Sequence, residues 1–88
     1  MKIVHSVAIP LRLEATVVPL PSGWTFLSAQ LKAGEPHAWF LVDPDVQYRQ
    51  AVYLQWIRTG QEVPTDLIYL ATVVNETVGE VYHLFRMS

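Results

Sequence analysis

Leu11-Arg12-Leu13-Glu14-Ala15-Thr16-Val17 is the stretch from which we predict the fold, because apolar and polar residues alternate along it. Successive side chains of a β-strand point to opposite faces, so this rhythm produces one apolar face and one solvated face. Similar short stretches recur along the whole chain, and prolines or glycines separate most of them. The pattern therefore predicts short strands joined by turns.

Seven strands are expected on this basis, at Lys2–Ile9, Leu11–Val18, Trp24–Lys32, His37–Asp43, Ala51–Arg58, Leu67–Val74 and Gly79–Met87. Pro19-Leu20-Pro21-Ser22-Gly23 predicts a turn, and Ala33-Gly34-Glu35-Pro36 predicts a hairpin connection. No connection is long enough for the helical crossover that a parallel sheet requires. We therefore expect residues 1–88 to form a single all-β domain, a small antiparallel sandwich or barrel.

One segment, residues 46–58, fits two structures. Its β-branched and aromatic content favours a strand at Ala51–Arg58. A helix capped by Asp45 would instead place Tyr48 and Trp56 on one face, and it remains the main alternative. We favour the strand, because the rest of the chain has β character and the other face of such a helix would carry few polar residues.

The composition excludes several classes of protein. Six basic residues are scattered without a run and the net charge is −2, so we do not expect direct nucleic-acid binding. The chain has no cysteine, which excludes disulfides and thiolate metal sites. No apolar run reaches the ~20 residues that span a bilayer, and the first residues do not resemble a signal peptide. We expect a cytoplasmic protein with no membrane partner.

No residue pattern indicates catalysis or metal binding. His5, His37 and His83 fall in three different predicted strands, without the spacing of a zinc site. His83 is expected at the edge of the core, donating a hydrogen bond to a backbone carbonyl. Asp43 and Asp45 flank a proline, which is typical of a turn. We therefore expect no catalytic residue, no metal and no cofactor.

Ten aromatic side chains exceed what one small core has to hold. Trp39 and Phe40 are adjacent, so one of them faces the core and the other faces away from it. An outward-facing aromatic side chain is suited to burying a protein partner. From loop position and aromatic content, the predicted binding residues are Arg58, Thr59, Gly60, Gln61, Trp56 and Tyr48.

Six motifs occur in a fixed order: Leu20-Pro21-Ser22-Gly23, Leu27-Ser28-Ala29-Gln30, Trp39-Phe40-Leu41-Val42-Asp43-Pro44, Thr59-Gly60-Gln61, Tyr69-Leu70-Ala71-Thr72 and His83-Leu84-Phe85. Together they resemble a family of small phage and prophage proteins classed as a domain of unknown function. The resemblance implies a phage-type origin, an all-β fold and a strand at Ala51–Arg58, but no activity. Gln61 stands where the family pattern has histidine and Ala71 where it has glycine, so no metal or acid–base role transfers to Gln61.

The leading expectation is a small non-enzymatic phage accessory protein that binds and occludes a bacterial anti-phage defence protein, such as a CRISPR complex. A homo-oligomer that sequesters a nucleotide immune signal is the first alternative. A structural protein decorating the phage particle is the second. An enzyme is the weakest class, since only His83 with Asp43 or Glu80 offers an acid–base pair.

Overall fold

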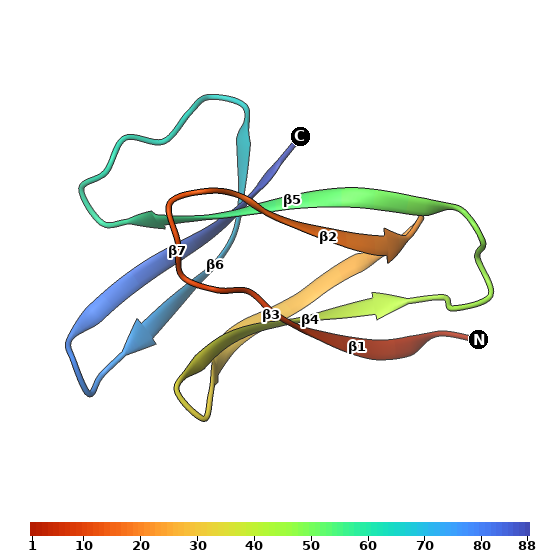
Figure 1. Ribbon diagram of the computed structural model, residues 1–88, viewed down its shortest axis with the longest axis horizontal. Coiled ribbons are helices and arrows are strands. Elements are labelled where there is room, and N and C mark those ends of the chain that lie inside the picture. The colour runs from red at the N-terminus through yellow and green to blue at the C-terminus, as the bar shows by residue number, and fades with distance from the viewer.

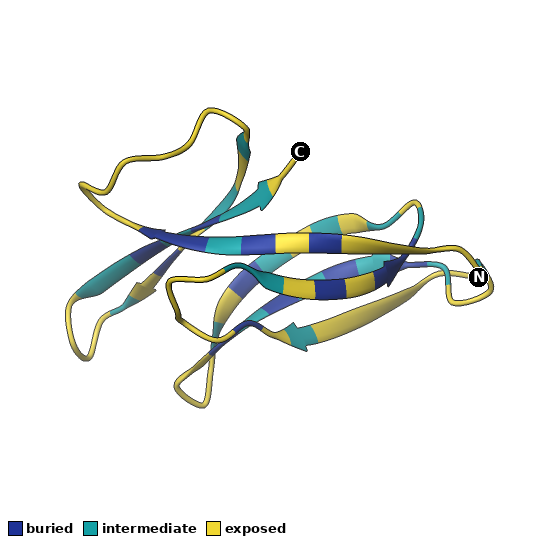
Figure 2. Cartoon of the chain, turned by 45° about the horizontal axis from the view of Figure 1, so that its top comes forward, coloured by how far each residue is buried: buried dark blue, intermediate teal, exposed yellow.

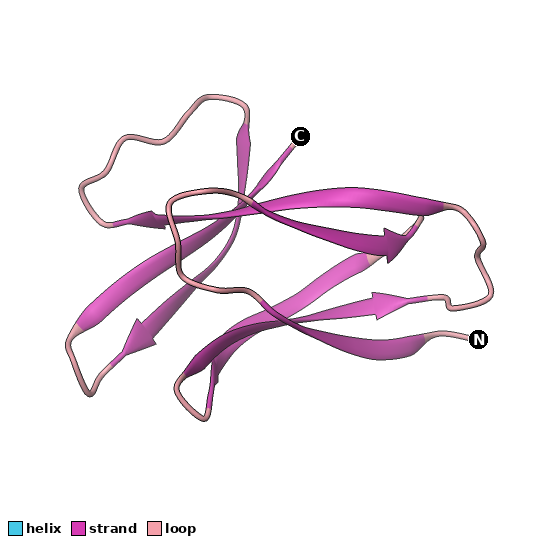
Figure 3. Cartoon of the chain, viewed as in Figure 1, coloured by secondary structure: helices cyan, strands magenta, loops and turns pink.

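A computed structural model describes residues 1–88, which form seven strands and no helix (Figures 1 and 3). One antiparallel sheet has the order β1 (Ile3–Ala8), β4 (Glu35–Val42), β3 (Thr25–Lys32). The second has the order β2 (Thr16–Pro21), β5 (Arg49–Arg58), β7 (Glu80–Met87), β6 (Leu67–Asn75). The all-β antiparallel prediction is confirmed, and the helix alternative at residues 46–58 is wrong.

The core lies between the two sheets and is built from alternate residues of the strands (Figure 2). Phe40 of β4 is completely buried, and the rings of Trp24 and Phe26 contact its ring edge-on, each with centroids 5.7 Å away. Leu54 and Leu84 of the second sheet are equally buried. The predicted alternation therefore exists in β4, β5 and β7, where it forms one shared apolar layer.

The prediction of a strand over Leu11–Val18 is wrong for its first half. β2 begins at Thr16, and the residues before it form a loop in which Leu13 is 82% exposed. The core-facing residues of β2 are Val18 and Leu20, whereas Val17 is exposed. The physical reason is topological: β1 and β2 belong to different sheets, so the chain between them has to cross from one layer to the other.

The predicted turn at Pro19–Gly23 is also wrong in its extent, because both prolines lie inside β2 and only Ser22-Gly23 turns. β2 is an edge strand, which can accept proline wherever the missing N–H would face away from the neighbouring strand. The Ser22 N–H donates to the Tyr48 carbonyl at 2.9 Å. Even-numbered backbone groups therefore face β5, and Pro19 and Pro21 face the free edge.

The hairpin between β3 and β4 is tighter than predicted, since its loop contains only Ala33 and Gly34. Their φ angles are +52° and +82°, as in a type I′ turn, which matches the twist of the two strands. Glu35 and Pro36, which were expected in the connection, begin β4. Ala33 therefore occupies a left-handed conformation that an L-residue with a Cβ rarely adopts.

Ala33→Asn should stabilise the protein by about 0.5–1 kcal/mol, because asparagine adopts the left-handed conformation at lower cost than alanine. Urea denaturation followed by circular dichroism measures the change. Ala33→Val is the control and should destabilise, since a β-branched side chain is poorly suited to positive φ. An asparagine variant no more stable than the parent would argue against the type I′ turn.

Candidate functional site

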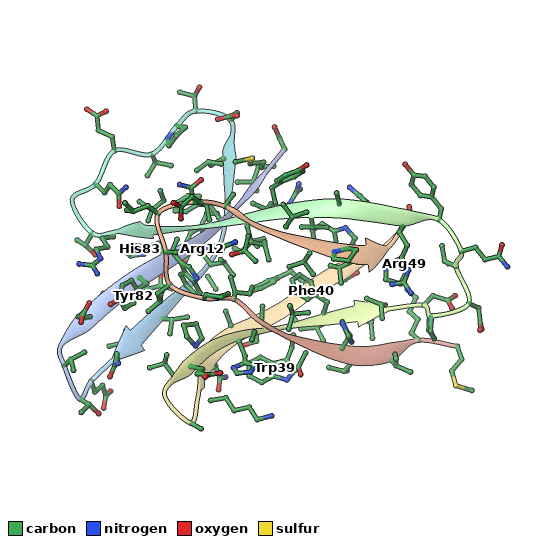
Figure 4. All side chains as sticks on the ribbon, viewed as in Figure 1. Arg12, Trp39, Phe40, Arg49, Tyr82 and His83 are labelled. Carbon is green, nitrogen blue, oxygen red and sulfur yellow. The ribbon has the colours of Figure 1, made fainter.

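A pocket of about 230 Å³ opens where the loop between β1 and β2 meets the end of β5. Three of the predicted binding residues line it: Trp56, Arg58 and Gln61. The remaining lining residues are Leu11, Arg12, Leu13 and Tyr82. Figure 4 shows Arg12 and Tyr82 at the same end of the molecule, opposite the end that carries Arg49.

Two adjacent side chains of β5 hold the loop in place. Trp56 Nε1 donates a hydrogen bond to the Ile9 carbonyl, and Gln55 Nε2 donates one to the Leu13 carbonyl, both at 3.1 Å. Both bonds end on backbone oxygens, so they fix the path of the loop whatever side chains it carries. Leu13 is thereby held beside the pocket although its own side chain is mostly in solvent.

The electrostatics of the pocket are set by two arginines and one carboxylate. Arg58 forms an ion pair with Glu80, with 3.6 Å between nitrogen and oxygen, and its guanidinium lies 5.4 Å from the centre of the Tyr82 ring. The Tyr82 hydroxyl donates a hydrogen bond to the same Glu80 carboxylate. Arg12 has only a long contact of 3.5 Å to the Ala15 carbonyl and no ion pair. One guanidinium at the pocket is therefore not neutralised by a carboxylate.

The hydrogen bond to Glu80 raises the pKa of the Tyr82 hydroxyl above its usual value of 10.0. Burial and the negative charge of Glu80 raise this pKa further, while Arg58 lowers it. The folded protein therefore holds the Tyr82 proton more tightly than the unfolded chain does. The resulting stabilisation is fully present below the unfolded pKa of about 10 and is lost as the pH rises through the folded pKa.

Tyr82→Phe should remove the most alkaline step from the tyrosinate absorbance titration of the folded protein. It should also weaken the loss of stability above a pH of about 10, since that loss requires a raised tyrosine pKa in the folded state. Spectrophotometric titration and urea denaturation between pH 8 and pH 11, values chosen to bracket the usual tyrosine pKa of ~10, measure both effects. Tyr48→Phe, at an exposed position far from Glu80, is the control. If both variants titrate alike, the Tyr82–Glu80 hydrogen bond is not present in solution.

The other predicted binding residues, which are Tyr48, Thr59 and Gly60, do not line this pocket. Tyr48 precedes β5 at its opposite end, and a strand of that length separates it from Arg58 by roughly 30 Å. Gly60 adopts a φ of +90° and forms the turn after β5.

Two of the residues that do line the pocket also have structural roles. The side chain of Gln61 accepts a hydrogen bond from the Arg58 N–H at 3.0 Å, so it closes the turn after β5. Trp56 is only 6% exposed, and its main contacts are in the core.

Thr59 contacts His83 on the outer face of the second sheet. His83 Nε2 lies 2.8 Å from the Thr59 hydroxyl, and Nδ1 lies 2.9 Å from the Thr72 hydroxyl, which in turn lies 2.7 Å from the Tyr69 hydroxyl. The expected hydrogen bond from His83 to a backbone carbonyl is therefore wrong, because Thr72 of β6 and Thr59, which directly follows β5, present two hydroxyls to the ring instead. Both ring nitrogens are engaged in this chain of hydrogen bonds.

His83 does not form an acid–base pair with either Asp43 or Glu80. Glu80 contacts Arg58 and Tyr82, while the Asp43 carboxylate accepts a hydrogen bond from the Asp45 N–H at 3.0 Å, as expected for a turn. His83 contacts neither carboxylate. No group of three or more His, Cys, Asp or Glu side chains is placed to hold a metal ion.

The sequence does not predict four of the residues that line the pocket, which are Leu11, Arg12, Leu13 and Tyr82. The first three were assigned to a strand, where Arg12 would simply have faced solvent. Pro10, directly before them, was the available signal that the strand ends and a loop begins. Nothing in the sequence indicates that this loop meets β5, because the contacts that bring them together join residues 42 and 47 positions apart.

A family described as Domain of unknown function (DUF7352) matches residues 1–88. No curated protein and no solved structure matches the chain. The structure contains no helix that is long and apolar enough to cross a membrane.

Proposed function

The chain belongs to the DUF7352 family of domains of unknown function, and we propose that it is a small non-enzymatic phage accessory protein. It acts by binding and occluding a bacterial protein of anti-phage defence, such as a CRISPR complex, in the host cytoplasm. The ordered motifs between Leu20 and Phe85 support the phage origin. The pocket beside the loop supports the mode of action.

The observation that carries the proposal is a small pocket with an exposed apolar rim. Its volume of about 230 Å³ falls below the ~300–1,000 Å³ of typical small-molecule sites. A pocket of this size suits one anchoring side chain of a protein partner. Leu13 and Leu11 beside it are 82% and 40% exposed, and burying such side chains supplies binding energy in protein interfaces.

The charges around the pocket favour an acidic partner surface. Arg12 has no carboxylate of its own, and Arg58 shares Glu80 with Tyr82. A carboxylate from the partner would form charge-assisted hydrogen bonds with the Arg12 guanidinium, which has no ion pair within the chain. Arginine, tryptophan and tyrosine are also the residues most enriched in binding hot spots.

The experiment is purification of the tagged protein together with defence proteins expressed in the same bacterium, followed by light scattering of the purified complex. Occlusion predicts a stable complex of fixed stoichiometry with one large host protein, and loss of that protein's activity in proportion to the complex formed. A captured protein that keeps full activity when saturated would contradict occlusion.

Sequestration of a nucleotide immune signal between the copies of a homo-oligomer is the second candidate, favoured by the presence of Arg12 and Arg58 beside two aromatic side chains. A ligand that binds only the folded state raises its thermal midpoint. Thermal denaturation with and without mono- and dinucleotides therefore separates the two functions. An increase in the midpoint that disappears in Arg12→Ser would favour sequestration over occlusion.

A further inference from the structure

The four edge strands of the two sheets differ in how they are protected from pairing with another chain. β2 directs Pro19 and Pro21 toward its free edge. β3 and β6 each contain an irregularity in register, between Phe26 and Ser28 and between Tyr69 and Ala71, and these two strands contact each other. Prolines, bulges and covering strands are the devices by which natural proteins block edge-to-edge association.

β1 has none of these devices. It contains no proline, no carboxylate, no lysine and no arginine, His5 being its only titratable side chain, and its pairing with β4 continues without interruption from Ile3 to Ala8. Its apolar side chains are only partly covered, since Ile3 is 44% exposed and Val4 59% exposed. Figure 1 shows the strand on the outer side of β4, at the margin of its sheet.

The free backbone groups of β1 can be assigned from one hydrogen bond. The Ile9 N–H donates to the Pro36 carbonyl of β4 at 2.9 Å, so odd-numbered residues direct their backbone groups toward β4. Val4, Ser6 and Ala8 therefore present their N–H and C=O groups to the open edge. None of the three is proline, so the edge offers an unbroken row of donors and acceptors.

We infer that β1 pairs antiparallel with β1 of a second copy of this chain, joining two three-stranded sheets into one of six strands. A twofold axis at Ser6 would place Val4 opposite Ala8 of the other copy and would form about six backbone hydrogen bonds. In this register Lys2 lies opposite Pro10 and His5 lies opposite Val7, so neither side chain lies opposite its own counterpart in the second copy. A second copy is the occupant that always brings a matching free edge, and such self-complementary contacts are the commonest basis of homodimers.

The monomer exposes slightly more surface than a compact chain of its mass. The chain exposes 5644 Å², compared with about 5,200 Å² expected for a compact monomer of its mass. The difference of several hundred Å² is expected for a flat molecule, which is only 16 Å thick. β1 lies at the margin of its sheet. The inference goes beyond the proposed function, and it predicts two partner pockets per assembly.

Ser6→Pro tests the inference, because it gives β1 the same protection that Pro19 and Pro21 give β2. It removes an N–H at the proposed axis while sparing the groups that bond to β4. Ser6→Lys is the second variant, since it places two ammonium groups directly opposite each other across the axis. Val17→Lys is the matched control, a substitution of an exposed residue on β2, the edge strand that prolines protect.

Sedimentation equilibrium over a range of concentrations gives the result. The parent protein and Val17→Lys should reach twice the chain mass of 10.0 kDa, and both Ser6 variants should dissociate at least tenfold more readily with unchanged circular dichroism. If Ser6→Pro misfolds, Ser6→Lys decides alone, because its side chain lies on the solvated face. A parent protein that stays monomeric, or a dimer that persists in Ser6→Lys, overturns the inference. A double variant at the pocket, Arg12→Ser with Leu13→Ser, should remain dimeric, which separates this test from that of the proposed function.

Discussion

Replacing Phe40 with alanine should lower the free energy of unfolding by about 3–5 kcal/mol. The Phe40 side chain is completely buried between the sheets, and two aromatic rings contact its ring at centroid distances of 5.7 Å. Its removal leaves a cavity that Trp24 and Phe26 cannot fill without leaving their positions. Total stability of small domains is about 5–15 kcal/mol, so this single change should leave the protein marginally folded.

Urea denaturation followed by tryptophan fluorescence measures the change in unfolding free energy. Leu27→Ala is the control, because Leu27 is 46% exposed on β3 and should contribute far less. Phe40→Leu should fall between the two, since it keeps most of the buried volume. A loss of less than about 1 kcal/mol in Phe40→Ala would mean that the two sheets do not close over this ring.

Replacing Arg12 and Leu13 together with serine should weaken partner binding by about 30-fold or more, which corresponds to loss of one hot spot of ~2 kcal/mol. Arg12 provides the guanidinium without a carboxylate partner, and Leu13 provides the most exposed apolar side chain of the rim. The loop should keep its path, because Gln55 and Trp56 bond to its backbone oxygens and not to these side chains.

Titration calorimetry of each purified variant into the purified partner measures the affinity, and the thermal midpoint shows whether the variant is folded. The matched control is a double variant of the same residue types, Leu27→Ser with Arg49→Ser, on exposed positions away from the pocket. Binding should be retained in the control. Equal loss in both double variants would show that the pocket is not the contact surface.

The strands with dense apolar and β-branched content could be predicted from the sequence, and they are the strands that form the core. β4 alternates buried positions with less buried ones, β5 does the same between Val52 and Trp56, and Trp39 and Phe40 face opposite sides of their sheet. Local side-chain content was sufficient there, because burial on one face is a property of each strand by itself.

Residues 11–15 show where local pattern fails. Their alternation resembles a strand, but the chain at this point crosses between sheets, and strand pairing depends on partners far away in sequence. From local pattern alone, Pro19 and Pro21 predict the end of a strand. An edge strand nevertheless accepts proline at positions where the missing N–H would face the free edge. Of the residues that line the pocket, the sequence predicts only Trp56, Arg58 and Gln61. The loop between β1 and β2 reaches them through hydrogen bonds between residues more than 40 positions apart.

Amide hydrogen exchange of the protein, with and without its captured partner, tests most directly that it acts by binding through this pocket. Bound partner should slow exchange in peptides covering Leu11–Leu13 and Arg58–Gln61, the two segments that surround the pocket. Exchange in the turn at Ala33 should stay the same. Slowed exchange confined to the outer face of β4, with none at the loop, would contradict the account.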